Sequence, residues 1–343
     1  MHQRDGRGMG AGRSVSAATA LAVLGVAGWL APVVFDRDAR RTLLGNVDGL
    51  GPQAPTPDRL AAATQTYMAD PRVRRMAVNG TELPYRDAGQ GPPVLLINGH
   101  GGGWWGWDRV VEELAVDHRV IAYSRRGYFG AGEPATAWEQ HQEDAATLLE
   151  HLDAPGAVVV AWSGGGSVAA ELALARPDLV AGLVLLEPGI YMRRHLTPEL
   201  VRILLAIQVR RALLPAEQAI DPVYRLVFTR DDGSSRWDGS DLPDAFRFGT
   251  LSTATAAFND LDLTAFTDPL ALEELARIPC PVTLLIGGRT YPLFPHIADT
   301  LETIIPDARR IVVADADHAM PYFEPAGTAE AIRAATSQVA ATI

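Results

Sequence analysis

The sequence predicts an α/β fold, with a mainly parallel, doubly wound sheet covered by helices on both faces. Continuous apolar runs at residues 93–98, 157–161 and 281–286 are typical of strands buried on both faces. Segments with helical periodicity lie between such runs, and repeated strand–helix units favour parallel pairing. The chain has 343 residues, of which 48 % are hydrophobic and 21 % charged, as in folded globular proteins.

The predicted elements begin near residue 74. Two strands joined by Asn79-Gly80 predict an opening hairpin, because this dipeptide favours tight hairpin turns. Further strands are expected over residues 93–98, 119–123, 157–161, 181–186, 281–286 and 310–313, and helices over residues 108–116, 137–152, 164–176 and 325–341.

Residues 190–276 interrupt this alternation. They contain no strong buried strand, but residues 198–214 and 241–259 have helical patterns. We expect a helical cap inserted between two strands, so that the core is divided into residues 72–189 and 277–343. Most aromatic residues of the insertion are interpreted as its own core: Tyr191, Phe228, Trp237, Phe246, Phe248, Phe258 and Phe266.

The N-terminal segment, residues 1–41, has the pattern of an export signal or membrane anchor. Residues 14–35 form an uncharged stretch long enough to cross a bilayer, and arginines precede it. We therefore expect membrane association or export, with residues 42–71 as a linker that leads into a short helix. If residues 14–35 instead form a helix packed on the protein, or follow a wrongly assigned start codon, a cytoplasmic protein is expected.

Charge and cysteine content exclude several functions. The net charge of -11 opposes binding to phosphate backbones, so no nucleic-acid partner is expected. All 30 basic residues are arginine. The single cysteine, Cys280, excludes an internal disulfide and a cysteine-based metal cluster, and its place before an apolar run predicts a small buried residue.

The strongest chemical signal is a serine that directly follows a buried strand. In Ala161-Trp162-Ser163-Gly164-Gly165 the flanking positions are small, as a sharp strand-to-helix turn requires. Such a turn would lift the Ser163 hydroxyl above the sheet edge, at the start of a helix whose dipole favours negative charge. Ser163 is the candidate nucleophile; a simple helix cap or a phosphate-binding loop are the alternatives.

The chain resembles the α/β-hydrolase fold family over about residues 72–341. Asn98-Gly99-His100 follows a strand where the family usually has His-Gly, and the segment 124–128 (SRRGY) is similar to the family's Asp-x-Arg-Gly-x turn. The resemblance implies acyl transfer by a serine, a histidine and a carboxylate, with no metal or organic cofactor. A serine nucleophile argues against the epoxide hydrolase and haloalkane dehalogenase branches, which use aspartate.

His318 is the candidate general base. It follows the last predicted strand and precedes the final helix, and an imidazole can both accept and return a proton near neutral pH. Five other histidines are interpreted as solvated: His118, His141, His151, His195 and His296.

Glu187 is the candidate acid. The loop after residues 281–286 usually carries it, but here Thr290 stands at the expected position and cannot carry the charge. Glu187 lies one strand earlier, at a strand end, where some branches of the family place their acid. Burial of this carboxylate would require a cationic or hydrogen-bonded partner. Asp315 and Asp317 are the alternatives.

Two backbone N–H groups are expected to form the oxyanion hole. Gly164 supplies one, and alignment with the family's His-Gly makes His100 the other, with Gly101 or Gly102 as alternatives. Trp104, Trp105 and Trp107 could line an acyl pocket or belong to the core.

These residues predict a serine hydrolase acting on a small ester-like molecule, namely a carboxylic ester, lactone or thioester. Three alternatives stay open. They are a non-enzymatic binding protein on the same scaffold, a hydroxynitrile-lyase activity, and a cofactor-free haloperoxidase-like or acyltransferase activity at the same residues.

Overall fold

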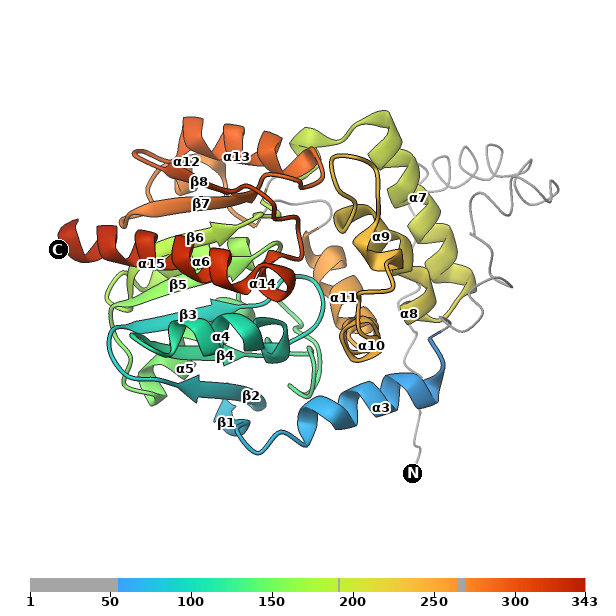
Figure 1. The fold of residues 1–343 in the computed structure, drawn as a ribbon, viewed down its shortest axis with the longest axis horizontal. Coiled ribbons are helices and arrows are strands. Elements are labelled where there is room, and N and C mark those ends of the chain that lie inside the picture. The colour runs from blue at the N-terminus through green and yellow to red at the C-terminus, as the bar shows by residue number, and fades with distance from the viewer. Residues whose placement is uncertain (1–54, 191, 265–268, 343) are drawn as a thin grey trace, which may run out of the picture. The chain divides into compact units, whose positions relative to one another are not determined.

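The computed structural model describes residues 55–190, 192–264 and 269–342. Its centre is an eight-stranded sheet in the order β1-β2-β4-β3-β5-β6-β7-β8 (Figure 1). The strands are β1 (Arg74–Val78), β2 (Thr81–Ala88), β3 (Pro93–Ile97), β4 (Arg119–Tyr123), β5 (Ala157–Trp162), β6 (Val180–Leu186), β7 (Val282–Gly287) and β8 (Arg309–Val313). β1 and β2 pair antiparallel, as do β2 and β4, and all other pairs are parallel. The predicted mainly parallel α/β sheet is confirmed.

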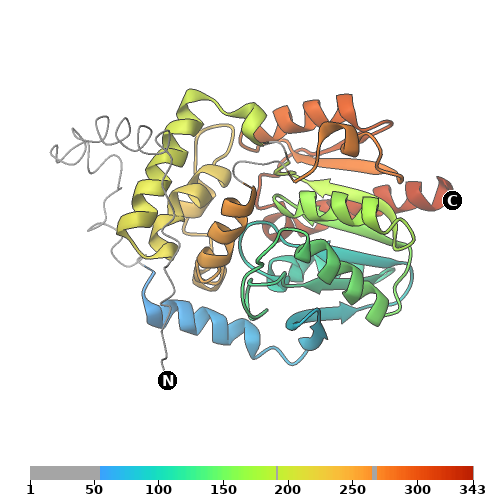
Figure 2. The ribbon, with the colours of Figure 1, turned by 180° about the vertical axis from the view of Figure 1, so that it is seen from behind.

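Helices cover both faces of the sheet, because strand residues alternate between two apolar cores. Val94 and Leu96 of β3 face α4 (Asp108–Leu114) and α15 (Pro325–Thr342). Leu95 and Ile97 face α5 (Gln140–His151), α6 (Gly165–Ala175) and α13 (Leu293–Ile304), which lie in front of the strands in Figure 2. The period of two along each strand thus builds the doubly wound arrangement.

The predicted hairpin and strand ends agree closely with the structure. Asn79 and Gly80 have φ values of 42° and 78°, the positive values that a tight hairpin turn needs.

The predicted helix over residues 241–259 is in fact two helices, with Thr253 at the break. The Thr253 hydroxyl donates to the carbonyl of Thr250 at 2.7 Å, so it competes for the helix's own hydrogen bonds.

Between β6 and β7 the described residues form helices and add no strand to the sheet. We call the elements from η4 to α12 the inserted helices. They are η4 (Met192–His195), α7 (Pro198–Leu213), α8 (Ala216–Ala219), α9 (Asp221–Val227), η5 (Arg236–Asp238), α10 (Asp244–Leu251), α11 (Ala254–Thr264) and α12 (Leu272–Leu275). Trp237, Phe246, Phe248 and Phe258 are buried among them.

The remaining helices are short, apart from α3 before the sheet. They are α3 (Pro57–Met68), η3 (Trp104–Trp107) and α14 (Met320–Phe323). α3 packs on α10, where Arg59 lies over the Phe248 ring, and on η3, where Tyr67 stacks on Trp105 with ring centroids 4.4 Å apart. In the described part of the chain no helix combines the length and apolar character needed to cross a bilayer. The anchor predicted at residues 14–35 lies outside the described residues.

Candidate active site

Ser163 occupies a sharp turn between β5 and α6. Its φ is 54°, a left-handed value that is unfavourable for a residue with a side chain. Two hydrogen bonds to the next strand and its loop hold this turn: the Ser163 N–H donates to the Leu186 carbonyl at 2.8 Å, and the Gly189 N–H donates to the Ser163 carbonyl at 2.9 Å. The predicted elbow is thus present as a strained, well-supported turn.

Glycines around Ser163 are required by close approach. A Cβ on Gly164 would lie 2.4 Å from the His100 ring, and one on Gly165 would lie 2.7 Å from the Asn98 carbonyl oxygen. A Cβ on Gly99 would lie 2.9 Å from the Ser163 Cβ. The loop after β3 therefore lies directly against the serine turn, and larger side chains at these positions would separate the two.

His318 follows β8 and is buried, with 4 % of its surface exposed. Its Nδ1 lies 3.3 Å from Oε2 of Glu187. The ring stacks on Phe294, with centroids 4.2 Å apart and planes 14° apart, and it also contacts Trp162 at 5.6 Å. These contacts fix the plane of the imidazole, and the Glu187 contact at Nδ1 leaves Nε2 on the opposite side of the ring.

Glu187 is fully buried at the end of β6, and hydrogen bonds compensate its burial. Oε1 accepts from the Gly287 N–H at 2.7 Å, and Oε2 accepts from the Thr290 hydroxyl. Thr290, which stands where the family usually carries its acid, thus donates to the carboxylate that comes from the neighbouring strand. The expectation of a partnered Glu187 is met by hydrogen-bond donors rather than by a cation.

The two alternative acids point elsewhere. Asp315 is exposed. Asp317 is buried, and its Oδ2 accepts from Arg230 Nε at 2.9 Å and from Arg236 Nε at 2.7 Å, both from the inserted helices and their connecting loops. Asp317 therefore connects the His318 turn to the inserted segment, and its carboxylate is occupied there.

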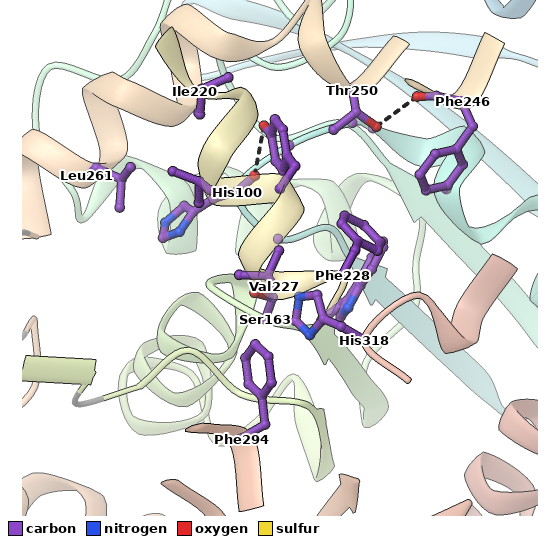
Figure 3. Close-up of a pocket in the computed structure, with 18 of the residues that line it drawn as sticks. His100, Ser163, Ile220, Val227, Phe228, Phe246, Thr250, Leu261, Phe294 and His318 are labelled. Atoms are coloured by element: carbon purple, nitrogen blue, oxygen red, sulfur yellow. Dashed lines mark hydrogen bonds between the residues drawn. The ribbon is translucent and has the colours of Figure 1, made fainter. Parts of the chain in front are cut away.

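Hydrogen bonds to Thr253 and Tyr224 of the inserted segment hold the glycine-rich loop after β3. The Gly102 N–H donates to the Thr253 hydroxyl at 3.0 Å, which disfavours Gly102 as an oxyanion donor. The Tyr224 hydroxyl donates to the His100 carbonyl at 3.2 Å (Figure 3). Burial lowers the pKa of the His100 ring to about 4, so the side chain is neutral at physiological pH.

A buried ionic network ties this loop to the inserted helices. Arg125, with no exposed side chain, donates to Asp260 of α11 at 2.7 Å and to the carbonyls of Asn98 and Gly99 at 3.0 and 2.8 Å. Tyr128 also donates to Asp260, at 2.8 Å. Burial alone would raise the pKa of Asp260, but the charge of Arg125 holds that pKa well below its usual range.

Ser163 and His318 both point into one cavity of about 80 Å³ (Figure 3). Its wall combines the glycine loop and Trp105 with apolar side chains from the inserted helices, including Tyr224, Val227 and Phe246. Among the described residues, no arginine or carboxylate belongs to this lining. Trp104 and Trp107 are fully buried outside the lining, so of the three tryptophans only Trp105 contributes to the cavity wall.

A model of the alpha/beta hydrolase family matches residues 94–331, a range that contains Ser163, Glu187 and His318. The chain belongs to the alpha/beta hydrolase family. This membership supports an enzyme with the general chemistry of the family.

Individual relatives differ in the reaction named for them. The hydrolase is 28 % identical to a soluble epoxide hydrolase of Corynebacterium sp., over 58 % of this chain and 78 % of the relative. It is 30 % identical to a non-heme chloroperoxidase of Streptomyces lividans, over 61 % and 79 % of the two chains. Among solved structures, a thermophilic esterase from Thermogutta terrifontis is 25 % identical, with a TM-score of 0.62 over 78 % of this chain and 99 % of the esterase.

Two histidines of the hydrolase contradict the sequence interpretation. His141 was expected to be solvated, but it is 1 % exposed and its Nε2 lies 2.9 Å from Asp260. Burial lowers the pKa of His141, so the neutral ring donates to this carboxylate. His118 is also buried, between Asp117 and Thr336. Asp260 and Thr336 lie 119 and 218 residues away from His141 and His118, so the local sequence does not show that these two histidines are buried.

Sequence reasoning also missed the contacts that orient the site. Phe294 against His318 and Arg125 against Asp260 join residues far apart in the chain. One signal was available: Arg125 lies in the segment similar to the family's Asp-x-Arg-Gly-x turn. Its charge in an apolar setting requires a buried carboxylate partner.

Proposed function

We propose that the protein is a serine hydrolase that cleaves a carboxylic ester, lactone or thioester through an acyl-enzyme. One observation carries this proposal: Ser163, on a strained turn, shares a cavity with His318, whose Nδ1 lies beside the buried carboxylate of Glu187. The proposed nucleophile, orienting acid and base therefore follow β5, β6 and β8, whose ends lie at the same edge of the sheet, and acyl transfer requires the three groups to be close together.

In this reaction Ser163 Oγ attacks the substrate carbonyl carbon while His318 Nε2 accepts the hydroxyl proton. The imidazolium that forms is stabilised by Glu187 at Nδ1. When the tetrahedral intermediate collapses, His318 returns the proton to the leaving alcohol or thiol, and the acyl group remains on Ser163. Water then gives up a proton to His318 and attacks the carbonyl carbon of the acyl-enzyme. His318 passes this proton to Ser163 Oγ as the bond to the acyl group breaks, and the acid is released.

The oxyanion is proposed to bind the backbone N–H groups of Gly164 and His100. A Cβ on Gly99 would lie 3.6 Å from the Gly164 nitrogen, which places the loop that carries His100 next to that donor. Removal of one such donor costs about 10²–10³ in turnover in serine hydrolases. These groups are main chain, so the His100 side chain is not required for this step.

The cavity favours a small, uncharged acyl group. One water needs about 10–15 Å³ on the scale on which this cavity measures about 80 Å³, so it has room for roughly five to eight water-sized groups. The described residues of its wall include no arginine to pair with a substrate carboxylate, which would be costly to bury there. We propose that the inserted helices act as a cap that supplies this wall.

A chain-length series of p-nitrophenyl esters tests this function. We expect the highest kcat/KM for acyl groups of about four to six carbons, weak hydrolysis of laurate, and little hydrolysis of a hemisuccinate ester. Ser163→Ala should abolish turnover. Ser167→Ala, which alters a buried serine in the adjoining α6, is the matched control and should retain it. Unchanged turnover in Ser163→Ala would refute the proposal.

The similarity to a chloroperoxidase favours one second candidate, a haloperoxidase-like activity at the same residues. It would need hydrogen peroxide and a halide as co-reactants. Halogenation of monochlorodimedone in their presence, lost in Ser163→Ala and faster than ester hydrolysis, would favour this candidate.

A further inference from the structure

The exposed apolar side chains of the described residues are concentrated in one place. Seven large apolar side chains of the described residues are exposed, and five of the seven lie between residues 196 and 213: Leu196, Val201, Leu204, Leu205 and Leu213. Scattered exposed apolar residues are ordinary, but a cluster on one element marks an interaction surface. α7, which carries most of them, lies on the side of the inserted helices away from the strands (Figure 1).

α7 is apolar on two adjoining sides. Leu200 and Ile207 are 5 % and 3 % exposed and belong to the hydrophobic cores. Val201, Leu204 and Leu205 are 40–45 % exposed, and spacings of three and four residues put them on one face. Packing within the protein accounts for the first side. The second, the α7 outer face, presents a continuous apolar strip to the surroundings.

The segment that carries this strip is basic in sequence, whereas the protein as a whole is acidic. Residues 192–213 contain five arginines and one glutamate, whereas the whole chain has a net charge of -11. Arg202 is exposed one residue after Val201. Arg211 is exposed as well and pairs with Asp262 at 2.6 Å. An apolar strip bordered by arginine is the pattern of a helix that lies in a lipid interface containing anionic headgroups.

We propose that the α7 outer face binds the surface of a phospholipid bilayer that contains anionic lipid. The sequence provides an independent argument for this occupant, since residues 14–35 have the length and flanking charge of a membrane anchor. The inference does not depend on the proposed chemistry. It would place a bilayer beside Met192 and Ile220, which flank α7 in the chain and line the cavity, so apolar substrates could enter from lipid.

A fluorescent probe on the full-length protein tests this surface. In a Cys280→Ser background, Leu204→Cys is labelled with the polarity-sensitive dye NBD, and Val116→Cys, with Val116 83 % exposed after α4, is the matched control. Vesicles of phosphatidylcholine, with or without phosphatidylglycerol, are then added. We expect a blue shift and about a twofold or larger rise in emission at position 204 with the mixed vesicles, and none at position 116.

Charge and competing occupants are tested in the same experiment. Arg202→Gln should reduce the change at position 204 and lessen its dependence on phosphatidylglycerol. Unchanged emission at position 204 in vesicle-bound protein would overturn the proposal. Blue-shifted emission without lipid would also overturn the proposal, because α7 would then be covered by protein. If dilution reverses the blue shift, a second copy of the protein covers α7. If dilution does not reverse it, the chain's own N-terminal segment covers α7.

Discussion

Asp260→Asn should destabilise the protein far more than an ordinary carboxylate substitution. Asp260 is 1 % exposed and accepts from Arg125, Tyr128 and His141 at 2.7, 2.8 and 2.9 Å. Asparagine keeps an acceptor but leaves the Arg125 charge buried without its counter-charge. Breaking one side of a buried ion pair costs about 3–5 kcal/mol. This corresponds to about two to three and a half powers of ten in the unfolding equilibrium.

The effect should reach the active site as well as stability. Arg125 also donates to the carbonyls of Asn98 and Gly99, the residues just before the proposed oxyanion donor His100. If Arg125 moves toward water, the carbonyls of Asn98 and Gly99 lose their hydrogen bonds from its guanidinium group. We therefore expect kcat for ester hydrolysis to fall about tenfold or more, in line with the loss of an oxyanion contact.

Asp262→Asn provides the control on the same helix. Asp262 pairs with Arg211, but both side chains are exposed, at 53 % and 36 %. Exposed pairs contribute about 0–1 kcal/mol, so this variant should unfold in urea almost as the wild type does. Equilibrium urea unfolding followed by tryptophan fluorescence measures both variants. A loss below about 1 kcal/mol for Asp260→Asn would refute the assignment of a tight buried pair.

Three further predictions concern buried titratable groups. Burial raises the pKa of Glu171 to about 8, so the contribution of this residue to stability is full below about pH 4.5 and is lost as pH rises toward 8. Glu171→Gln keeps the acceptor for Trp138 and should remove this pH dependence of the free energy of unfolding, measured in urea. Burial lowers the pKa of His100 to about 4, so stability should fall as pH drops from about 6.5 to 4, and His100→Gln should flatten that range when the same unfolding is followed against pH. Asp317→Asn removes the buried carboxylate that Arg230 and Arg236 share, although Arg236 keeps its pair with Asp241, and should cost about 3 kcal/mol in thermal or urea unfolding. The kcat of the folded fraction should fall far less than in Glu187→Gln, and an equal loss of kcat in both variants would contradict this division of roles.

The fold could be predicted because its signals are local. β3, β5 and β7 are continuous apolar runs, and small residues on both sides of Ser163 indicate the strand-to-helix turn. Glu187 could be located by the rule that parallel strands end at one edge of the sheet. From this rule alone, without any knowledge of side-chain contacts, Glu187 is expected to lie close to the turn after β8 that carries His318.

The rest depends on contacts between distant segments. No local sequence pattern indicates that Asp260 is buried, and its partner Arg125 is 135 residues away. His141 therefore looked like a surface histidine of an amphipathic helix, although Asp260 binds it in the interior. Asp317 adjoins His318 in sequence, yet the arginines of the inserted segment turn its carboxylate away from the imidazole. Pattern and periodicity carry no information about such pairings.

The central claim is that Ser163 becomes acylated during turnover. Rapid mixing of the protein with p-nitrophenyl butyrate, followed by acid quenching and peptide mass spectrometry, measures it most directly. We predict a butyryl group on the peptide that contains Ser163, formed in a burst of about one nitrophenolate per protein and slowed about 10³-fold or more in Glu187→Gln. Sustained ester turnover with no adduct at Ser163, or with the adduct on another residue, would contradict the account.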